Sequence, residues 1–145
     1  MTTRREFLLL ASGLTAANAY ATPEEMRAAL RKVVGGAQVR RGRVKLDLPP
    51  LIDNGNSVTL SVSVASPMTP AEHVKAIHLF TEKNPQPYVL SAYFGPRSGE
   101  ARVSTRIRLA DSQTVHAVAL MNDGSLWSDS VEVIVTLSAC LGDLI

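Results

Sequence analysis

Apolar and polar residues alternate with a period of two over most of the chain beyond residue 43, which is the spacing of half-buried β-strands. Turn-forming residues interrupt this alternation at short intervals, and the Asp123-Gly124 pair is a strong hairpin signal. About seven strands at this spacing predict an all-β fold, an immunoglobulin-like antiparallel β-sandwich. The predicted strands cover Val44–Leu48, Val58–Val64, Val74–Phe80, Tyr88–Phe94, Arg102–Leu109, Thr114–Met121 and Leu126–Leu137.

A different period, close to 3.6, precedes the strands. Thr22, Pro23 and Glu25 have the order of a capping box with proline at the first helical position, which marks a helix start. Gly35-Gly36 marks its end. The pattern predicts a short N-terminal helix whose apolar stripe consists of Met26, Leu30, Val33 and Val34.

The first 21 residues have the order of an export signal. Arg4-Arg5 comes before an apolar run, Phe7–Leu14, and small residues at Ala17, Ala19 and Ala21 follow. The apolar run is shorter than the roughly 20 residues that span a bilayer. We interpret residues 1–21 as a twin-arginine signal, with an uncleaved apolar helix as the alternative. We therefore expect a periplasmic protein without a membrane anchor after cleavage, beginning at Tyr20 or Thr22.

Composition after this signal limits the function classes. The remaining chain has 13 basic and 12 acidic residues, and this near neutrality argues against binding to nucleic acid. Its length suits one domain, which we place at residues 22–137, followed by a C-terminal arm at residues 138–145.

The chain shows no catalytic or metal motif. His73, His78 and His116 are dispersed without ligand spacing, so we interpret them as surface or partly buried side chains and expect no metal and no cofactor. No serine lies in a nucleophile-elbow sequence.

An arginine stripe and the single tryptophan each have two possible interpretations. Arg102, Arg106 and Arg108 share one face of a predicted strand, which we interpret as a solvated sheet face, with a docking stripe for anions or an acidic partner as the alternative. Trp127 is expected to anchor the core, with an interface role as the alternative.

Cys140 is the only cysteine, and it follows the last predicted strand. An unpaired thiol in an oxidising compartment has to be protected, paired with another molecule or used. From the residues alone, a reactive handle and a small buried apolar side chain are equally good interpretations.

Several segments together resemble SoxY, the sulfur-carrier subunit of the periplasmic thiosulfate-oxidising Sox system. The resemblance runs from about Met26 to Cys140 and includes a twin-arginine leader. The segments that carry it are Ser66-Pro67-Met68-Thr69, Val74-Lys75-Ala76-Ile77-His78, Glu82-Lys83-Asn84-Pro85, Val103-Ser104-Thr105-Arg106-Ile107-Arg108-Leu109-Ala110 and Asp123-Gly124-Ser125.

The resemblance implies a covalent carrier and not an enzyme. It assigns Cys140 as the sulfur attachment point on an arm that includes Ser138, Ala139, Leu141 and Gly142. A c-type cytochrome would load thiosulfate on the thiol, and a sulfate-releasing hydrolase and a sulfane-oxidising enzyme would process it. The resemblance also implies a heterodimer with a SoxZ-like subunit.

The arm itself differs from the family ending Gly-Gly-Cys-Gly-Gly. Only Gly142 remains here, and Leu141, Leu144 and Ile145 are apolar. We expect a stiffer arm that docks on the partner and shields the thiol. The alternative function is a non-catalytic interaction subunit whose cysteine carries nothing. A thiol-disulfide enzyme is disfavoured because there is no second cysteine.

Overall fold

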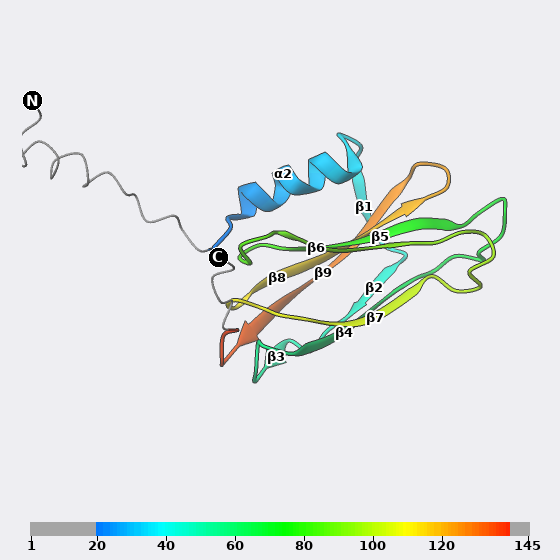
Figure 1. Cartoon of the computed structure of the whole chain (residues 1–145). Helices are drawn as coiled ribbons and strands as arrows, with labels where there is room; N and C mark the ends of the chain where they lie inside the picture. Colours follow the sequence, from blue (N-terminus) through cyan, green and yellow to red (C-terminus); the bar gives the residue numbers. More distant parts are fainter. Residues whose placement is uncertain (1–19, 140–145) are drawn as a thin grey trace, which may run out of the picture.

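The structure is a computed structural model, and it describes residues 20–139. Residues 1–19 of the predicted signal lie outside the described residues. Within the described part, the chain forms one helix and nine strands (Figure 1). These are α2 (Pro23–Val34), β1 (Val39–Arg41), β2 (Val44–Asp47), β3 (Leu51–Ile52), β4 (Val58–Val64), β5 (Val74–Thr81), β6 (Tyr88–Tyr93), β7 (Arg102–Ile107), β8 (Gln113–Met121) and β9 (Leu126–Val135). The helix is too short to cross a membrane, and no other helix occurs between residues 20 and 139.

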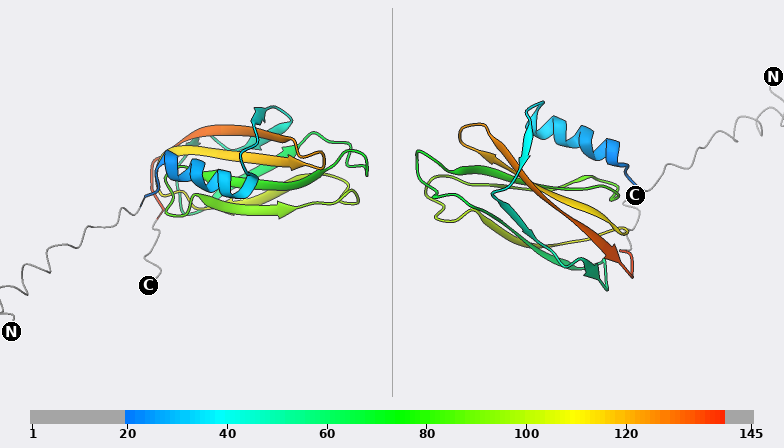
Figure 2. Two further views of the ribbon diagram at one scale, coloured as in Figure 1. Left: turned by 90° about the horizontal axis from the view of Figure 1, so that it is seen from above. Right: turned by 180° about the vertical axis from the view of Figure 1, so that it is seen from behind.

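The strands form two sheets packed face to face. The larger sheet has the order β1-β9-β8-β5-β6, with β3 also paired to β9, and the smaller sheet has the order β2-β4-β7. Helix α2 lies on the outer face of the larger sheet (Figure 2). The predicted all-β sandwich with an N-terminal helix is therefore confirmed, and the seven predicted strands are β2 and β4 to β9.

Two strands were not predicted, and both change the pairing. Strands β1 and β3 have three and two residues, which is too short for an alternating pattern to be visible. Both pair with β9 in the parallel direction. Every pairing among the seven predicted strands is antiparallel, as expected, and the two short strands add parallel pairings at β9.

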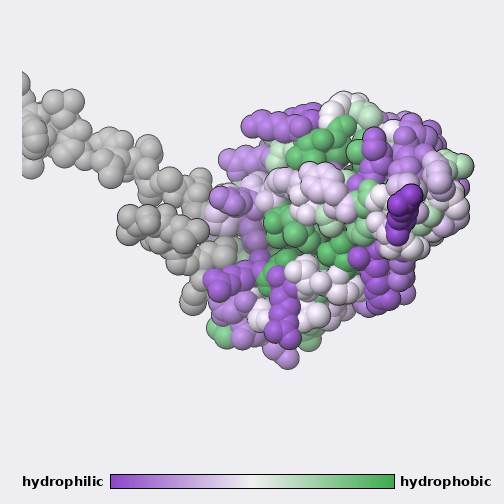
Figure 3. Space-filling view, turned by 45° about the vertical axis from the view of Figure 1, so that its right-hand side comes forward, coloured by the Kyte–Doolittle hydropathy of each residue, from purple (hydrophilic) through white to green (hydrophobic). Residues whose placement is uncertain are grey.

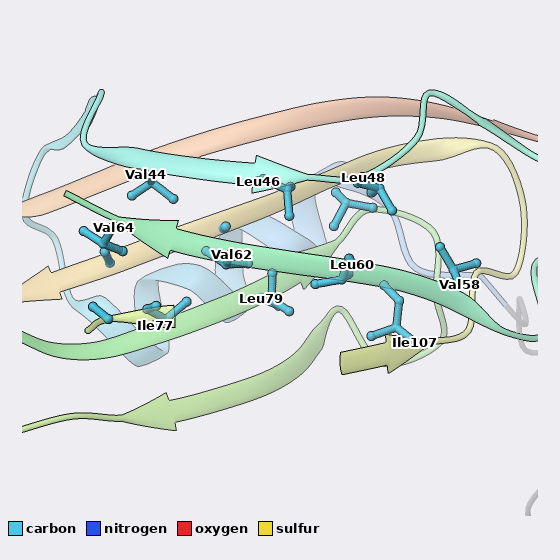
Figure 4. Packing of buried hydrophobic residues seen from close by; sticks show 14 of the residues in the cluster. Val44, Leu46, Leu48, Val58, Leu60, Val62, Val64, Ile77, Leu79 and Ile107 are labelled. Carbon is cyan, nitrogen blue, oxygen red and sulfur yellow. The ribbon is translucent and has the colours of Figure 1, made fainter. Parts of the chain in front are cut away.

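The core lies between the sheets, where the inward side chains of alternating positions interdigitate (Figure 4). Leu60 and Val62 of β4 face Ile77 and Leu79 of β5, and all four are nearly or fully buried. Alternation of this kind is what the period of two predicts, because successive strand side chains point to opposite faces.

A second, smaller cluster lies between α2 and the larger sheet. Met26 of the helix packs there with Phe80, Val118 and Leu126 of the sheet. The predicted stripe is confirmed, since Leu30, Val33 and Val34 also pack on this cluster as half-buried side chains.

Helix α2 begins with the predicted capping box. The Thr22 hydroxyl accepts a hydrogen bond from the Glu25 backbone N–H, and the Glu25 carboxylate accepts one from the Thr22 N–H. Thr22→Ala removes the first of these bonds, so we expect the free energy of unfolding to fall by about 1 kcal/mol. Urea unfolding of the parent and the variant measures this, and an unchanged midpoint would show that the cap contributes nothing.

Candidate functional site

The end of β9 is fixed to the segment around β3. The Ile134 N–H donates to the Pro50 carbonyl at 2.8 Å, and the Thr136 N–H donates to the Ile52 carbonyl at 2.9 Å. The Thr136 hydroxyl donates to the Asp53 carbonyl at 3.0 Å. The parallel pairing of β3 with β9, which was not predicted, therefore holds the chain as far as Thr136, one residue beyond the end of β9.

Past the strand, the backbone is held by a chain of three hydrogen bonds around Gly55. The Gly55 N–H donates to the Leu137 carbonyl at 2.7 Å, and the Leu109 N–H donates to the Gly55 carbonyl at 2.9 Å. The Leu109 carbonyl accepts the third bond, from the Ala139 N–H, at 3.0 Å. We call these three bonds the C-terminal clamp. The clamp also explains why the strands predicted to reach Leu109 and Leu137 end earlier, because their last backbone groups bond to a turn and not to a neighbouring strand.

Gly55 lies in unusually close contact with the other parts of the clamp. A Cβ atom at this position would lie 2.5 Å from the Leu109 carbonyl oxygen and 3.0 Å from the Ala139 nitrogen. Its φ angle is not among the positive ones, so the requirement for glycine is steric. The turn thus fits into the clamp only without a side chain.

A buried amide network supports the Leu109 part of the clamp. The Asn84 side-chain N–H donates to the Arg108 carbonyl at 2.8 Å, and its oxygen accepts from the Ala110 N–H at 2.9 Å. Gln113 donates to the same oxygen at 3.0 Å. Asn84 therefore forms hydrogen bonds to the residues on both sides of Leu109. It is a supporting residue that was not identified from the sequence.

The structure places only the first part of the predicted arm. Ser138 is exposed and Ala139 is half-buried within the clamp. Cys140, Leu141 and Gly142 lie outside the described residues, so the attachment point and the rest of the arm stay predictions.

Exposed apolar side chains gather at this end of the molecule. Leu51 and Ile134 are neighbours across the β3–β9 pairing, and Leu137 follows two residues after β9. Each of the three is more than half exposed. The region around the clamp is therefore more apolar than a freely solvated strand end requires.

The three histidines are not brought together into a metal site. His116 on β8 lies 3.0 Å from the Glu82 carboxylate, whereas His73 precedes β5 and bonds to the Thr69 carbonyl. Within residues 20–139, no group of three His, Cys, Asp or Glu side chains could hold a metal ion. His78 differs from its prediction as a surface or partly buried side chain, because only 4% of it is exposed.

His78 lies on β5, on the outer face of the larger sheet, among aromatic rings. Its Nδ1 atom is 3.0 Å from the Tyr88 hydroxyl, and its ring meets Tyr93 edge to face. Burial lowers the pKa of His78 below its usual value of 6.5, because the charged imidazolium loses hydration there. The groups that the structure places against the His78 ring are the Tyr93 ring and the Tyr88 hydroxyl, and not a carboxylate.

This burial predicts a pH dependence of stability. The unfolded state binds a proton at His78 more readily than the folded state, so the free energy of unfolding should fall as the pH drops below about 6.5. His78→Asn keeps a polar atom for Tyr88 but does not titrate. We expect the variant to lose less stability than the parent between about pH 7 and pH 5. Equal slopes in chemical denaturation over that range would contradict the assignment.

The arginine stripe is exposed, as expected for a solvated face. Arg102 and Arg106 lie on β7 opposite Ser63 and Thr59 of β4, and Arg108 follows just after the strand. No salt bridge involves these three arginines among the described residues. Their role as a docking stripe stays an untested alternative.

Trp127 is only partly a core residue. It is half-buried against the main core, and the guanidinium groups of Arg40 and Arg43 lie 5.8 and 5.1 Å from its ring centre. This group lies at the start of β9, next to the β8–β9 hairpin and therefore at the opposite end of the strand from the clamp.

Comparison with known proteins gives one family and several related structures. The model of the family described as sulfur oxidation protein SoxY matches residues 30–140. The sulfur carrier protein SoxY from Chlorobium limicola f thiosulfatophilum superposes with a TM-score of 0.67 at 25% identity, covering 79% of this chain and 98% of that chain. No curated protein sequence matches the chain.

Superoxide reductases share the fold at lower identity. The protein from Ignicoccus hospitalis, called neelaredoxin, has a TM-score of 0.58 at 20% identity and covers 79% of this chain and 94% of its own. The one from Nanoarchaeum equitans has a TM-score of 0.54 at 12% identity, with 66% and 100% covered. At these identities the likeness concerns the architecture of the sandwich and not its chemistry.

Proposed function

Because the chain belongs to the SoxY family of sulfur oxidation proteins, we propose that it is a sulfur carrier that holds thiosulfate-derived intermediates covalently on Cys140. The observation that carries the proposal is the extent of the family match, which runs through residue 140, the position of the only cysteine in the sequence. The similar solved structure of a protein named as a sulfur carrier supports it.

The chemistry needs a thiolate, because thiolate is the form that exchanges sulfur bonds. In the proposed loading step, a bond forms between the Cys140 sulfur and the outer sulfur of thiosulfate. The thiol proton leaves, and two electrons pass to a c-type cytochrome. Water then cleaves the terminal sulfur–sulfonate bond in a hydrolase and releases sulfate, and a sulfane-oxidising enzyme acts on the sulfur that stays on the cysteine.

The proposed role is that of a carrier and not of an enzyme. A single cysteine cannot alternate between dithiol and disulfide by itself, so the oxidant has to come from a partner. The site that the structure describes beside residue 140 consists of backbone amides and carbonyls that hold the chain in place. This arrangement suits presentation of a thiol to other proteins.

We propose that the first of these partners is a SoxZ-like subunit that forms a heterodimer with this chain. Strands β6 and β7 end their sheets, and half-buried side chains of this region, among them Leu90 and Val103, pack on the core. In the view of Figure 3 a band of apolar side chains crosses the middle of the molecule between polar regions. Exposed apolar side chains that gather in one region are typical of an interaction surface. Copurification of the exported protein with a second small sandwich protein tests the pairing.

We also propose that the protein is periplasmic and exported by the twin-arginine route. Of the two cleavage positions, the one after Ala19 keeps Ala21, which is buried, and leaves the Thr22 N–H as an amide in the capping box. We therefore expect the mature chain to begin at Tyr20. Cell fractionation with N-terminal sequencing tests this, and a full-length protein retained in the cytoplasm would contradict it.

The function is tested by reconstitution. The mature protein, its SoxZ-like partner, the c-type cytochrome and thiosulfate are combined, and cytochrome reduction is followed. A carrier is required for sustained reduction, so omission of this chain should reduce the rate to background. Suppose that cytochrome is reduced equally fast without this chain, and that the SoxZ-like partner nevertheless binds the chain in a separate binding measurement. The interaction-subunit alternative is then the better account.

A further inference from the structure

We infer that Gly55 is a positioning residue for the carrier thiol, because its turn anchors the backbone one residue before Cys140. The C-terminal clamp makes the end of the sandwich a fixed pivot for the thiol. This inference deepens the proposed carrier role and depends on that role for its functional meaning, whereas the anchor itself can be tested without sulfur chemistry.

The anchor shortens the tether of the thiol. Counted from Val135, the last residue of β9, five residues lead to Cys140, a span of roughly 16 Å at about 3.3 Å per extended residue. The hydrogen bond from the Ala139 N–H to the Leu109 carbonyl removes most of this length. One Cα–Cα step, about 3.8 Å, then separates the last anchored residue from Cys140.

The steric fit of Gly55 makes the anchor depend on this glycine. A Cβ at residue 55 would approach the Leu109 oxygen at 2.5 Å, and the Ala139 nitrogen and the Val135 Cγ1 atom at 3.0 Å each. The Leu109 oxygen and the Ala139 nitrogen are the acceptor and the donor of the last clamp bond. A methyl group at residue 55 therefore pushes against both partners of the bond that anchors the arm.

A short tether determines how partners reach the thiol. Because one Cα–Cα step separates the anchored Ala139 from Cys140, each enzyme has to contact the surface around Ala139 to reach the thiol. That surface includes the exposed side chains of Leu51, Ile134 and Leu137. The partner enzymes therefore have to approach the thiol at the end of the sandwich.

A spin label on the only cysteine measures the anchor directly. The mature protein is labelled at Cys140 with a nitroxide methanethiosulfonate, and the parent is compared with Gly55→Ala. The clamp predicts a broad, restricted spectrum for the parent and a narrower, mobile one for Gly55→Ala. Amide exchange at Ala139 should also accelerate about tenfold, the loss expected for one net hydrogen bond. Gly36→Ala is the matched control, because a Cβ at Gly36 meets no atom within 4 Å.

A second variant covers the case in which Gly55→Ala fails to fold. Ala139→Pro removes the donor of the last clamp bond and leaves Gly55 untouched, and it should mobilise the label in the same way. A lower melting temperature for Gly55→Ala with an unchanged label spectrum and unchanged exchange at Ala139 would overturn the inference, since it would make Gly55 merely structural. Neither readout uses thiosulfate or a partner, so failure of the carrier proposal and failure of the anchor are distinguishable.

Discussion

Cys140→Ser is expected to reduce thiosulfate-dependent cytochrome reduction in the reconstituted system to the rate measured without the carrier. A hydroxyl at this position cannot form the sulfur–sulfur bond, and the chain has no other thiol that could replace it. The loss should be complete and not partial, because every intermediate of the proposed pathway is attached to the same sulfur atom. Folding should be unaffected, which a melting curve of the variant checks.

The position of the thiol is tested by moving it. Ser104 is exposed on β7, so Ser104→Cys in the Cys140→Ser background provides a solvent-accessible thiol in the middle of a strand. The account predicts no recovery of activity, because a thiol there is not presented beyond the end of the sandwich. Full activity of Cys140→Ser alone would contradict the assignment of Cys140.

Asn84→Ala is expected to cause the largest loss of stability among the substitutions considered. The side chain satisfies the buried Ala110 N–H and the Arg108 carbonyl, and it accepts a bond from Gln113. A buried polar group left without a partner costs about 1–3 kcal/mol. The substitution leaves at least two such groups, the Ala110 N–H and the Arg108 carbonyl, without their partner. The free energy of unfolding should therefore fall by about 2–4 kcal/mol. Denaturant unfolding monitored by Trp127 fluorescence measures it.

Gln86→Ala is the matched control for this prediction. Gln86 carries an amide in the same loop but is exposed, and its side chain makes none of these buried bonds. Its substitution should change the free energy of unfolding by less than about 0.5 kcal/mol. Equal effects of the two substitutions would show that the Asn84 network does not stabilise the loop that carries Leu109.

Much of the fold follows from the sequence because burial alternates within each long strand. In β4, Val58, Leu60, Val62 and Val64 are buried while the residues between them face outward, which is the pattern that the period of two predicts. The helix follows from the local chemistry of Thr22, since a capping box involves residues only three apart.

The two short parallel strands and the C-terminal clamp could not be predicted in this way. A pairing such as Leu51 with Ile134 joins residues far apart in the sequence and leaves no periodic pattern. The clamp joins Gly55, Leu109 and Ala139, and its bonds are made by backbone atoms, which every residue type has. In the sequence Gly55 is one of many turn-forming residues between strands, and its steric role depends on segments of the chain that meet in three dimensions.

Asn84 shows a similar limit. It was visible as part of a segment resembling the family, Glu82-Lys83-Asn84-Pro85, but nothing in that segment assigns it a task. Its burial and its three hydrogen bonds depend on the approach of residues 108–113. The assignment of Cys140 thus stays a prediction from the sequence, whereas the backbone bonds that hold Leu137 and Ala139 were visible only in the structure.

The most direct test of the carrier proposal is the intact mass of the mature protein, purified with its partner, after exposure to thiosulfate and the c-type cytochrome. The account predicts an added thiosulfate-derived group that requires the cytochrome, is located at Cys140 and is released by a reductant. An unchanged mass with a free thiol at Cys140 after the same treatment would contradict it.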